Sequence, residues 1–316
     1  MSFDRDFHLQ DHDLYLKVFE LTVQIPRGRV STYGAIARAL GDKAASRAVG
    51  RMLSADRDRP FKVPCHRVVY SDGRTGWYTG MGRGEAQKQE LLRDEGVPIS
   101  EGKVQDFEKV RFEDFHGGGL LETMAKAQVG LAALVDQQGD ATSFKRIAGL
   151  DVAYEGDKAY AAMVVVDRQG KILEHERSKC QVNFPYVPGY LGFREMRPFS
   201  RLLKDPRDDT LYLIDGHGRA HPRRAGIASQ FGVVHNVASA GVAKSMLAGL
   251  MERGSLSLDG EEVGRLVKNV RGQARFLSIG HKVGLSSLCQ LYLSLPVDPI
   301  DLAHVACDED KRGDRP

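Results

Sequence analysis

The spacing of the apolar residues changes near residue 125, and this change divides the chain into two halves of different fold class. Between residues 14 and 100 apolar side chains recur at helical spacing, beginning with Leu14 and Val18. Later they fall into runs of strand length, of which Leu211–Ile214 is the strongest. We therefore expect an α/β protein overall, with a mostly helical N-terminal domain and a C-terminal domain built on a mixed sheet.

The chain of 316 residues is long enough for about two domains. We expect the first domain over residues 1–100. Charged residues and three consecutive glycines predict a linker over residues 101–125, although an ordinary loop has the same composition. The second domain is expected over residues 126–306, followed by a disordered polar tail over residues 307–316.

Two short helices joined by a tight turn are predicted in the first domain. The first begins after Ser31 and ends at Gly41, and Asp42 can cap the second. The second helix carries Arg47 and Arg51. This arrangement is a helix-turn-helix, and we expect a winged helix-turn-helix-like fold that binds DNA.

The charge distribution agrees with a nucleic-acid partner better than the total charge does. The net charge is only +3, but residues 27–83 hold twelve cations and four anions. A local excess of positive charge suits a phosphate backbone, whereas a mixed solvated face with internal ion pairs is the alternative.

The cysteines and the hydropathy limit the possible cellular settings. Four cysteines occur without paired spacing, which favours neither a disulfide framework nor a zinc site. No apolar run approaches the roughly 18 residues that a membrane span needs. We expect a monomer in a reducing prokaryotic cytoplasm, associated with the nucleoid and not with a membrane.

One cysteine lies in a chemically suggestive setting, the sequence Pro64-Cys65-His66-Arg67. A cysteine attacks as its thiolate, and an imidazole that takes the proton is the usual way to form one. The alternative is a buried, inert cysteine. The surrounding motifs favour the nucleophile.

Those motifs together resemble the DNA-binding, active-site domain of O6-alkylguanine-DNA alkyltransferases over most of residues 14–100. They comprise a Tyr in the first helix, Arg-Ala-Val-Gly opening the second, Pro-Cys-His-Arg-Val, a Gly-x-Tyr-x-Gly element and a Glu after a Leu-Leu pair. The resemblance implies that Cys65 accepts the alkyl group, that His66 relays its proton and that Glu95 orients the imidazole. No cofactor is implied. The residues implied in DNA contact and base flipping are Tyr33, Arg47, Arg67 and Tyr78.

Two positions depart from that family. Met81 occupies a position that is often Gly, and Arg57 occupies one that is often Asn. These departures leave open a second hypothesis, in which the domain binds alkylated guanine as a sensor without transfer.

Acidic residues at strand ends mark the second domain. Asp151 lies in a predicted strand, and Asp215 ends the strand 211–214. Glu195, in a predicted helix, adds a third acid. Carboxyl ends of strands are where α/β proteins build sites, and oxygen ligands without cysteine favour Mg²⁺ or Mn²⁺. For any one of these acids alone, a cap or turn role is the alternative.

Residues 145–295 resemble endonuclease V, the deoxyinosine-specific nuclease with a ribonuclease-H-like sheet. The matching elements include Gly-Leu-Asp-Val-Ala-Tyr from Gly149, Phe-Pro-Tyr-Val-Pro-Gly from Phe184 and the run from Asp215 to Arg224. The resemblance implies Asp151, Glu195 and Asp215 as metal ligands for Mg²⁺ or Mn²⁺. Its other implied functional residues are Lys244 at the phosphates, His281 near the metal or its water, Tyr186 as a wedge and His221 at the DNA. One departure is Leu285 before a Ser pair, where the family often has an acid.

The two resemblances together predict a bifunctional DNA-repair enzyme. One domain would transfer alkyl groups from O6-alkylguanine to Cys65. The other would nick DNA at the second phosphodiester 3′ of deoxyinosine. Inosine in RNA is an alternative substrate, because metal carboxylates and a wedge serve both polymers.

Overall fold

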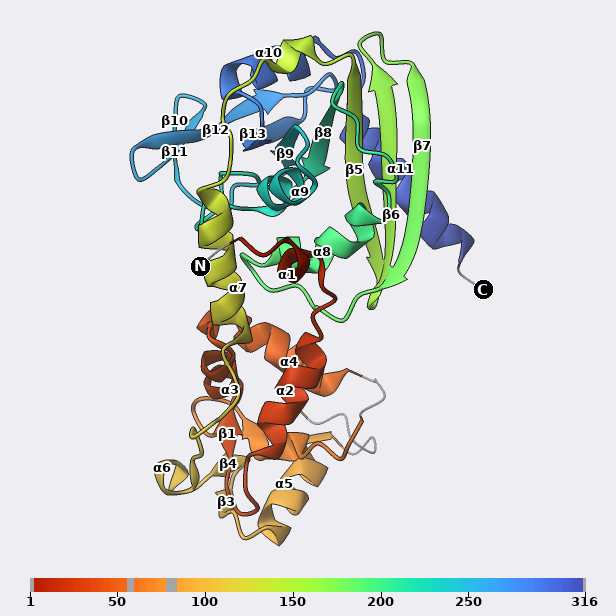
Figure 1. Ribbon diagram of the computed structural model, residues 1–316. Helices are drawn as coiled ribbons and strands as arrows, with labels where there is room; N and C mark the ends of the chain where they lie inside the picture. The colour runs from red at the N-terminus through yellow and green to blue at the C-terminus, as the bar shows by residue number, and fades with distance from the viewer. Residues whose placement is uncertain (1–2, 56–59, 78–83, 315–316) are drawn as a thin grey trace. The chain divides into compact units, whose positions relative to one another are not determined.

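A computed structural model describes residues 3–55, 60–77 and 84–314 of the chain (Figure 1). The chain forms two compact units. The helical unit comprises Asp13–Met124 and the short segment Pro185–Pro188. The sheet unit comprises Met1–His12, Ala125–Phe184 and Gly189–Pro316, so it includes the first residues of the chain. The expected first domain of residues 1–100 therefore differs from the helical unit at both ends.

The helix-turn-helix of the helical unit is formed by α3 (Tyr33–Leu40) and α4 (Ser46–Ser54), packed on α2 (Leu14–Val23). The cap of α3 is Thr32, whose side chain accepts from Ala35 N at 3.0 Å. The prediction of Ser31 as this cap was wrong by one residue, because α3 begins at Tyr33 and Thr32 is the residue that precedes it.

The turn between the two helices uses the residues that the sequence indicated. Gly41 ends α3 with φ of 103°, a left-handed conformation that glycine adopts without strain. Asp42 caps a 3₁₀ turn (η1, Lys43–Ala45) and not α4 itself. The second helix therefore begins four residues after Asp42, at Ser46.

Short strands and a hairpin complete the helical unit. Strands β1 (Ser31–Thr32) and β2 (Val68–Val69) pair in parallel, and β3 (Ile99–Ser100) pairs with β4 (Lys103–Val104) in antiparallel fashion. Helix α5 (Gly84–Asp94) packs beside the 3₁₀ turn η2 (Cys65–Arg67). A small core formed by Val30, Val69, Leu92, Val97 and Val104 holds these pieces together.

The predicted linker over residues 101–125 is wrong, because this segment is folded. It contains β4, the short helix α6 (Phe107–Val110) and the start of α7 (Leu120–Ala132). Val30 exchanges backbone hydrogen bonds with Val110 and Phe112. A Cβ on Gly118 would lie 2.0 Å from the carbonyl oxygen of Ala39, so this glycine serves close packing.

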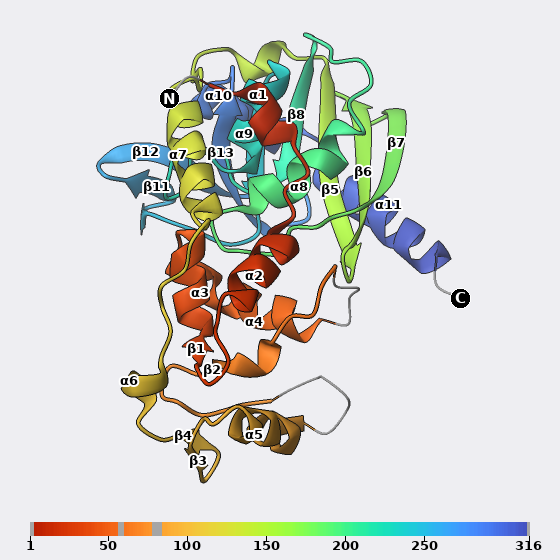
Figure 2. The same ribbon diagram turned by 60° about the horizontal axis from the view of Figure 1, so that its bottom comes forward.

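The sheet unit is built on a mixed sheet of nine strands in the order β10-β11-β12-β13-β9-β8-β5-β6-β7 (Figures 1 and 2). Strand β5 lies parallel to β8, which lies parallel to β9, and the other pairs are antiparallel. This confirms the expected mixed α/β sheet. The strands are β5 (Arg146–Glu155), β6 (Lys158–Asp167), β7 (Ile172–Gln181), β8 (Thr210–Asp215), β9 (Ser239–Ala243), β10 (Leu250–Glu252), β11 (Ser255–Leu258), β12 (Glu261–Lys268) and β13 (Ala274–His281).

Alternating residues of the central strands face two hydrophobic cores. On β8, Leu211 and Leu213 belong to one core, and Tyr212 and Ile214 belong to the other. Residues of α10 (Leu285–Ser294) and α11 (Pro299–Gly313) contribute to the first core. Residues of α8 (Leu191–Ser200) and α9 (Ile227–His235) contribute to the second. The remaining elements are α1 (Arg5–Leu9) and the 3₁₀ turn η4 (Ala141–Ser143).

The predicted disordered tail over residues 307–316 is also wrong, because α11 continues to Gly313. Ala306 and Cys307 are buried against Ala162 of β6. Asp314 then forms ion pairs with Lys158 and Lys179. The charged composition of this segment reflects the solvent face of an amphipathic helix.

Within the described residues, no helix combines the length and the apolar character that crossing a bilayer requires.

Candidate active sites

The first candidate site surrounds Cys65, which opens the 3₁₀ turn η2 and is 6% exposed. Nε2 of His66 lies 3.0 Å from Oε1 of Glu95. Arg67 donates to both oxygens of the same carboxylate, from Nε at 2.8 Å and from Nη2 at 2.7 Å. The two residues that follow Cys65 therefore both contact one carboxylate, which comes directly after α5 and about thirty positions later in the sequence.

The electrostatics of this cluster fix its protonation at neutral pH. Burial raises the pKa of Glu95, but hydrogen bonds from Arg67 and His66 outweigh it and lower the pKa to about 2. Burial lowers the pKa of His66, more than the contact with Glu95 raises it. An ionised Glu95 accepts from Nε2–H of a neutral imidazole, which leaves Nδ1 as the basic atom.

The guanidinium of Arg67 makes its hydrogen bonds within the helical unit, and its contact with DNA stays a prediction. We expected it to contact DNA, but its guanidinium holds Glu95 and donates to the carbonyl oxygen of Ile25 at 2.7 Å. The side chain is only 17% exposed. Its hydrogen-bonding groups are thus used inside the helical unit.

Tyr33 and Arg47, which the resemblance implied in DNA contact and base flipping, line one cavity of about 600 Å³. Tyr70, Trp77 and Arg51 line the same cavity, so aromatic rings and guanidinium groups surround it. Burial raises the pKa of Tyr33 to about 12, so its hydroxyl stays protonated. Three residues of the sequence hypothesis, Tyr78, Met81 and Arg57, lie outside the described residues.

Lys88 is a member of this site that sequence reasoning missed. It lies in α5 and is 1% exposed, with Nζ 5.9 Å from the centre of the Tyr33 ring. Burial lowers its pKa to about 8, whereas the charges of Cys65 and Glu85 raise it. A cation in this place favours the thiolate form of Cys65. A lysine on the apolar face of a predicted helix was the available signal.

The second candidate site lies at the carboxyl end of the parallel strands β5 and β8. Leu150 pairs with Ile214, so Asp151 and Asp215 follow at the same level on neighbouring strands. Both project to the same face, because side chains alternate along each strand. Asp151 and Glu195 are each 6% exposed.

The three carboxylates repel one another, which shows that they are gathered in one place. Burial and then the charge of Asp215 raise the pKa of Asp151. Burial and then the charges of Asp151 and Asp215 raise the pKa of Glu195 well above its usual value. Carboxylates that are desolvated and crowded in this way are those that a cation stabilises.

The donor set fits a hard divalent ion, which prefers carboxylate oxygens. No three His, Cys, Asp or Glu side chains in the described part of the chain converge tightly enough to enclose one. Instead Lys244 donates from Nζ to Oδ2 of Asp215 at 2.7 Å. Burial lowers the pKa of Lys244, but the hydrogen bond to Asp215 and the charges of the nearby carboxylates outweigh burial. The pKa of Lys244 is therefore raised overall. The lysine therefore supplies a positive charge among the carboxylates.

Of two histidines considered for this site, His304 contacts it and His281 does not. His281, which the resemblance implied near the metal, ends β13 opposite Ser239, three positions before Val242, the residue of β9 that pairs with Asp215. It therefore lies toward the opposite ends of the strands, where it is 6% exposed and its Nδ1 accepts from the backbone N–H of Asp136 at 3.1 Å. Burial lowers its pKa, so the ring is neutral with its proton on Nε2. His304 of α11, which the sequence reading missed, contacts Oδ2 of Asp151 through Nδ1 at 2.7 Å. Only the three-dimensional fold reveals it, because no motif surrounds it.

The loop after Asp215 is packed as closely as backbone allows. A Cβ on Gly218 would lie 2.0 Å from the carbonyl oxygen of Ile279, and one on Gly241 would lie 2.5 Å from the nitrogen of Gly218. The loop therefore sits directly on β9 and β13. These glycines hold Asp215 in register with the neighbouring strands.

His221, which the resemblance implied at the DNA, is buried and makes backbone contacts inside the fold. It is 3% exposed, its Nε2 lies 3.1 Å from the carbonyl oxygen of Gly189, and its Nδ1 accepts from the backbone of Arg223. Burial lowers its pKa to about 3, so the ring is neutral. This histidine holds the backbone of Gly189 in place, and its contact with DNA stays a prediction.

Tyr186 has the exposure that a wedge requires. Its side chain is 48% exposed, whereas its neighbours Phe184 and Val187 are each 1% exposed. Arg194 donates to the carbonyl oxygen of Phe184 and stacks over the ring of Tyr154 at 3.8 Å. The base of this segment is therefore fixed, and the tyrosine is presented outward.

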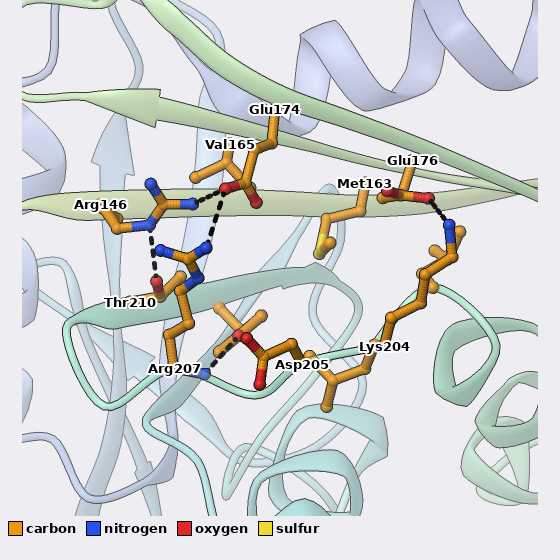
Figure 3. Close-up of a pocket in the computed structure, with 12 residues that line it drawn as sticks. Arg146, Met163, Val165, Glu174, Glu176, Lys204, Asp205, Arg207 and Thr210 are labelled. Carbon is orange, nitrogen blue, oxygen red and sulfur yellow. Dashed lines mark hydrogen bonds and ion pairs between the residues drawn. The ribbon is translucent and has the colours of Figure 1, made fainter.

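A separate cavity of about 220 Å³ lies at the start of β5 and β8, at the opposite strand ends from Asp151 and Asp215 (Figure 3). Its rim carries the ion pairs Arg146–Glu174 and Lys204–Glu176. These charges neutralise each other, and the catalytic carboxylates do not line this cavity. It is distinct from the candidate nuclease site.

Two family profiles match the chain, one in each unit. The family profile described as "Endonuclease V" matches residues 129–302. The profile described as "6-O-methylguanine DNA methyltransferase, DNA binding domain" matches residues 13–97. The second match begins at the first residue of the helical unit.

Two relatives match the chain along most of its length. A "Bifunctional methyltransferase/endonuclease" of Thermoplasma volcanium is 38% identical over 282 residues, which cover 89% of this chain and 84% of the relative. A protein of the same name from Picrophilus torridus is 34% identical, and the match covers 92% and 93% of the two chains. Among solved structures, endonuclease V from Streptomyces avermitilis aligns with a TM-score of 0.53 at 33% identity, covering 61% of this chain and 93% of the other.

Proposed function

The chain belongs to the endonuclease V family and, along most of its length, to the bifunctional methyltransferase/endonuclease proteins, and on this premise we propose that it repairs two purine lesions in DNA. The sheet unit would nick DNA at the second phosphodiester 3′ of deoxyinosine, using Mg²⁺ or Mn²⁺. The helical unit would transfer alkyl groups from O6-alkylguanine to Cys65. The proposal depends above all on the three crowded carboxylates Asp151, Glu195 and Asp215.

In the nuclease reaction these three carboxylates would hold the metal. A bound divalent ion lowers the pKa of a water ligand and stabilises the leaving oxygen of a phosphodiester. His304 fixes one oxygen of Asp151 by a hydrogen bond. Lys244 carries positive charge that suits a phosphate oxygen.

Tyr186 would supply the wedge that takes the place of a displaced base. Its ring is half-exposed between two prolines, which restrict the backbone on either side. A rigid aromatic ring loses little entropy when it enters a base stack. Deaminated purines pair weakly, so displacing one costs less than displacing a normal base.

In the alkyl-transfer reaction Cys65 would act as the acceptor. His66 Nδ1 takes the thiol proton, directly or through water, while ionised Glu95 stabilises the imidazolium. The sulfur then forms a bond to the alkyl carbon, and the carbon–O6 bond breaks. The electron pair stays with guanine, which takes up a proton. The thioether is stable, so each molecule reacts once.

The nuclease proposal is tested with matched DNA and RNA strands that contain one inosine. The full chain with Mg²⁺ or Mn²⁺ should nick the DNA strand. Faster cleavage of the RNA strand would instead indicate that inosine in RNA is the preferred substrate. Asp215→Ala should abolish nicking, whereas Asp208→Ala, which changes an exposed acid on the loop before β8, should not. Residual cleavage by Asp215→Ala on either strand would show that the metal site is assigned wrongly.

The transfer proposal is tested by incubating the protein with duplex DNA that carries O6-methylguanine and mapping the adduct by peptide mass spectrometry. The methyl group should appear on the Cys65 peptide and be absent from Cys65→Ser. Cys180→Ser, which changes another buried cysteine, should react normally. A tight complex without methylation of Cys65 would instead support the sensor hypothesis.

A further inference from the structure

The first residues of the chain belong to the sheet unit, although the whole helical unit follows them in the sequence. Residues 3–12 contain α1, which packs against α8 and α9 (Figures 1 and 2). The sheet unit then continues only from Ala125. The polypeptide therefore leaves the sheet unit after His12 and returns to it within α7.

An aromatic cluster attaches this segment to α8. The ring of His8 stacks on Phe193, with centroids 5.5 Å apart and planes at 13°. Phe7 and His12 meet the same phenyl ring edge-on, at 5.9 Å and 5.8 Å. His8 and His12 are 2% and 7% exposed. Three side chains from ten residues thus enclose one ring of α8.

Polar contacts add specificity to this attachment. Nε2 of Gln230 in α9 lies 3.0 Å from Nδ1 of His8, and Asp11 forms an ion pair with Arg197 of α8. A Cβ on Gly192 would lie 1.4 Å from the side-chain oxygen of Gln230, so this glycine leaves room for the glutamine side chain. His8 therefore contacts α8 through Phe193 and α9 through Gln230.

Helix α8 needs such support from outside. Its N-cap residue, Tyr190, makes no side-chain cap hydrogen bond, and Pro198 lies inside the helix. Phe193 and Glu195 are two residues apart, so they project about 200° apart around the helix axis. Contact at Phe193 therefore presses the opposite face, which carries Glu195, toward the carboxylates.

We propose that residues 3–12 are an integral part of the nuclease domain, that the alkyltransferase-like unit is inserted between this segment and α7, and that His8 and Phe7 position Glu195 through α8. The positioning role depends on the proposed nuclease function. The insertion itself does not.

The insertion is tested by native-state hydrogen exchange of the full chain in increasing denaturant, followed by mass spectrometry of peptides. Residues 3–12 should lose protection at the same denaturant concentration as peptides of α8 and α9. Loss of protection together with α2–α4, or no protection at all, would overturn the proposed topology. This result needs no activity.

The positioning role is tested with His8→Ala, with His8→Phe as the conservative variant and with Asp6→Ala as the control. Asp6 is exposed on the same helix. Binding of Mn²⁺ alone is followed by electron paramagnetic resonance at a temperature where circular dichroism shows all variants folded. His8→Ala should weaken Mn²⁺ binding about tenfold, and His8→Phe, which keeps the ring stack, should recover part of it.

Nicking kinetics provide the second readout. His8→Ala should lower kcat at subsaturating Mn²⁺ and leave KM for inosine DNA unchanged, because His8 is 2% exposed and its contacts are with Phe193 and Gln230. Unchanged Mn²⁺ affinity in folded His8→Ala would overturn the positioning role. If the unmodified protein binds Mn²⁺ but does not nick inosine DNA or RNA, the proposed function fails while the exchange experiment still decides the insertion.

Discussion

Nδ1 of His304 lies 2.7 Å from Oδ2 of Asp151, a residue that precedes it by 153 positions. The histidine comes from the last helix, and the aspartate comes from the first strand of the sheet. This contact fixes the orientation of one carboxylate among three that repel one another. Residues that hold a metal-binding carboxylate in this way contribute strongly to metal affinity.

We therefore expect His304→Ala to weaken Mn²⁺ binding about tenfold, because Asp151 loses the hydrogen bond that orients it. Titration of Mn²⁺ with electron paramagnetic resonance checks this directly. His304→Asn retains a donor and should recover part of the affinity. His175→Ala, which changes an exposed histidine on β7, is the control and should bind normally. Equal affinities for all four proteins would contradict the role of His304.

Loss of the Glu95 carboxylate should slow alkyl transfer. In Glu95→Gln the imidazolium of His66 has no anionic partner and Arg67 loses its bidentate contact. We expect the transfer rate to fall about 100-fold, within the range of general acid–base effects. Single-turnover methyl transfer measures it, and Glu90→Gln, an exposed position on the same helix, should transfer at the normal rate.

The pH dependence of transfer follows from His66. Burial lowers its pKa below the usual 6.5, so the imidazole remains a neutral base as the pH falls through 6.5. We expect the transfer rate to stay constant across that pH and to decline only at lower values, where His66 becomes protonated. A rate that already halves near pH 6.5 or above would show that a different base acts. Stopped-flow fluorescence of a labelled substrate gives this profile.

Lys88 should make the stability of the helical unit depend on alkaline pH. Burial lowers its pKa from 10.5 to about 8. Below pH 8 the lysine is protonated in both states, and the folded state carries the full cost of the buried charge. Between pH 8 and 10.5 the unfolded chain binds a proton that the folded unit does not, so stability rises with pH, by up to about 3 kcal/mol.

Denaturation of the helical unit at several pH values between 7.5 and 10.5 checks this expectation. Lys88→Met keeps an unbranched apolar side chain and removes the charge. At pH 7.5 this variant should therefore be more stable than the unmodified protein, and its stability should increase little between pH 8 and 10.5. Lys109→Met, at an exposed position, should retain it. A Lys88→Met protein that is less stable at pH 7.5 would indicate that the charge is stabilised in the folded state.

Gly218→Ala should disrupt the nuclease site without affecting alkyl transfer. The new methyl group would meet the carbonyl oxygen of Ile279 at 2.0 Å, which the packed loop cannot accommodate without moving Asp215. We expect the sheet unit to lose about 3 kcal/mol or more of stability. Gly260→Ala is the control for replacing a glycine by alanine, because its added atom would meet nothing within 4 Å. The positive φ of Gly260 makes this control substitution slightly strained. Thermal unfolding measures the stability of the sheet unit, and adduct formation in the same samples measures alkyl transfer by the helical unit.

The residues of the two candidate sites could be identified from the sequence because most of them lie in local patterns. Cys65 and His66 are adjacent, and Asp215 ends an apolar strand. Lys88 and His304 carry no such pattern, since their roles depend on what a distant segment places beside them. Arg67 and His221 show the converse. Their side chains suit DNA, but nearby carbonyl and carboxylate groups inside the fold bind them.

The ends of the domains were predicted less well for a related reason. Residues 101–125 and 307–316 are rich in charge and glycine, which suggested flexibility. Their few apolar members, such as Val104 and Cys307, are nevertheless buried. A short segment that adds one or two side chains to an existing core has too little periodicity to be recognised from sequence alone.

The contact between His8 and Gln230 also has a consequence for the order of folding. It closes a loop of 222 residues, and the entropy of such a closure costs about 5 kcal/mol in a fully flexible chain. During synthesis the first segment leaves the ribosome long before α8 and α9 exist, so it stays without its partners while residues 13–124 emerge. If those residues fold first, far fewer flexible residues remain in the loop that must close. Early folding of the inserted unit would then accelerate completion of the nuclease.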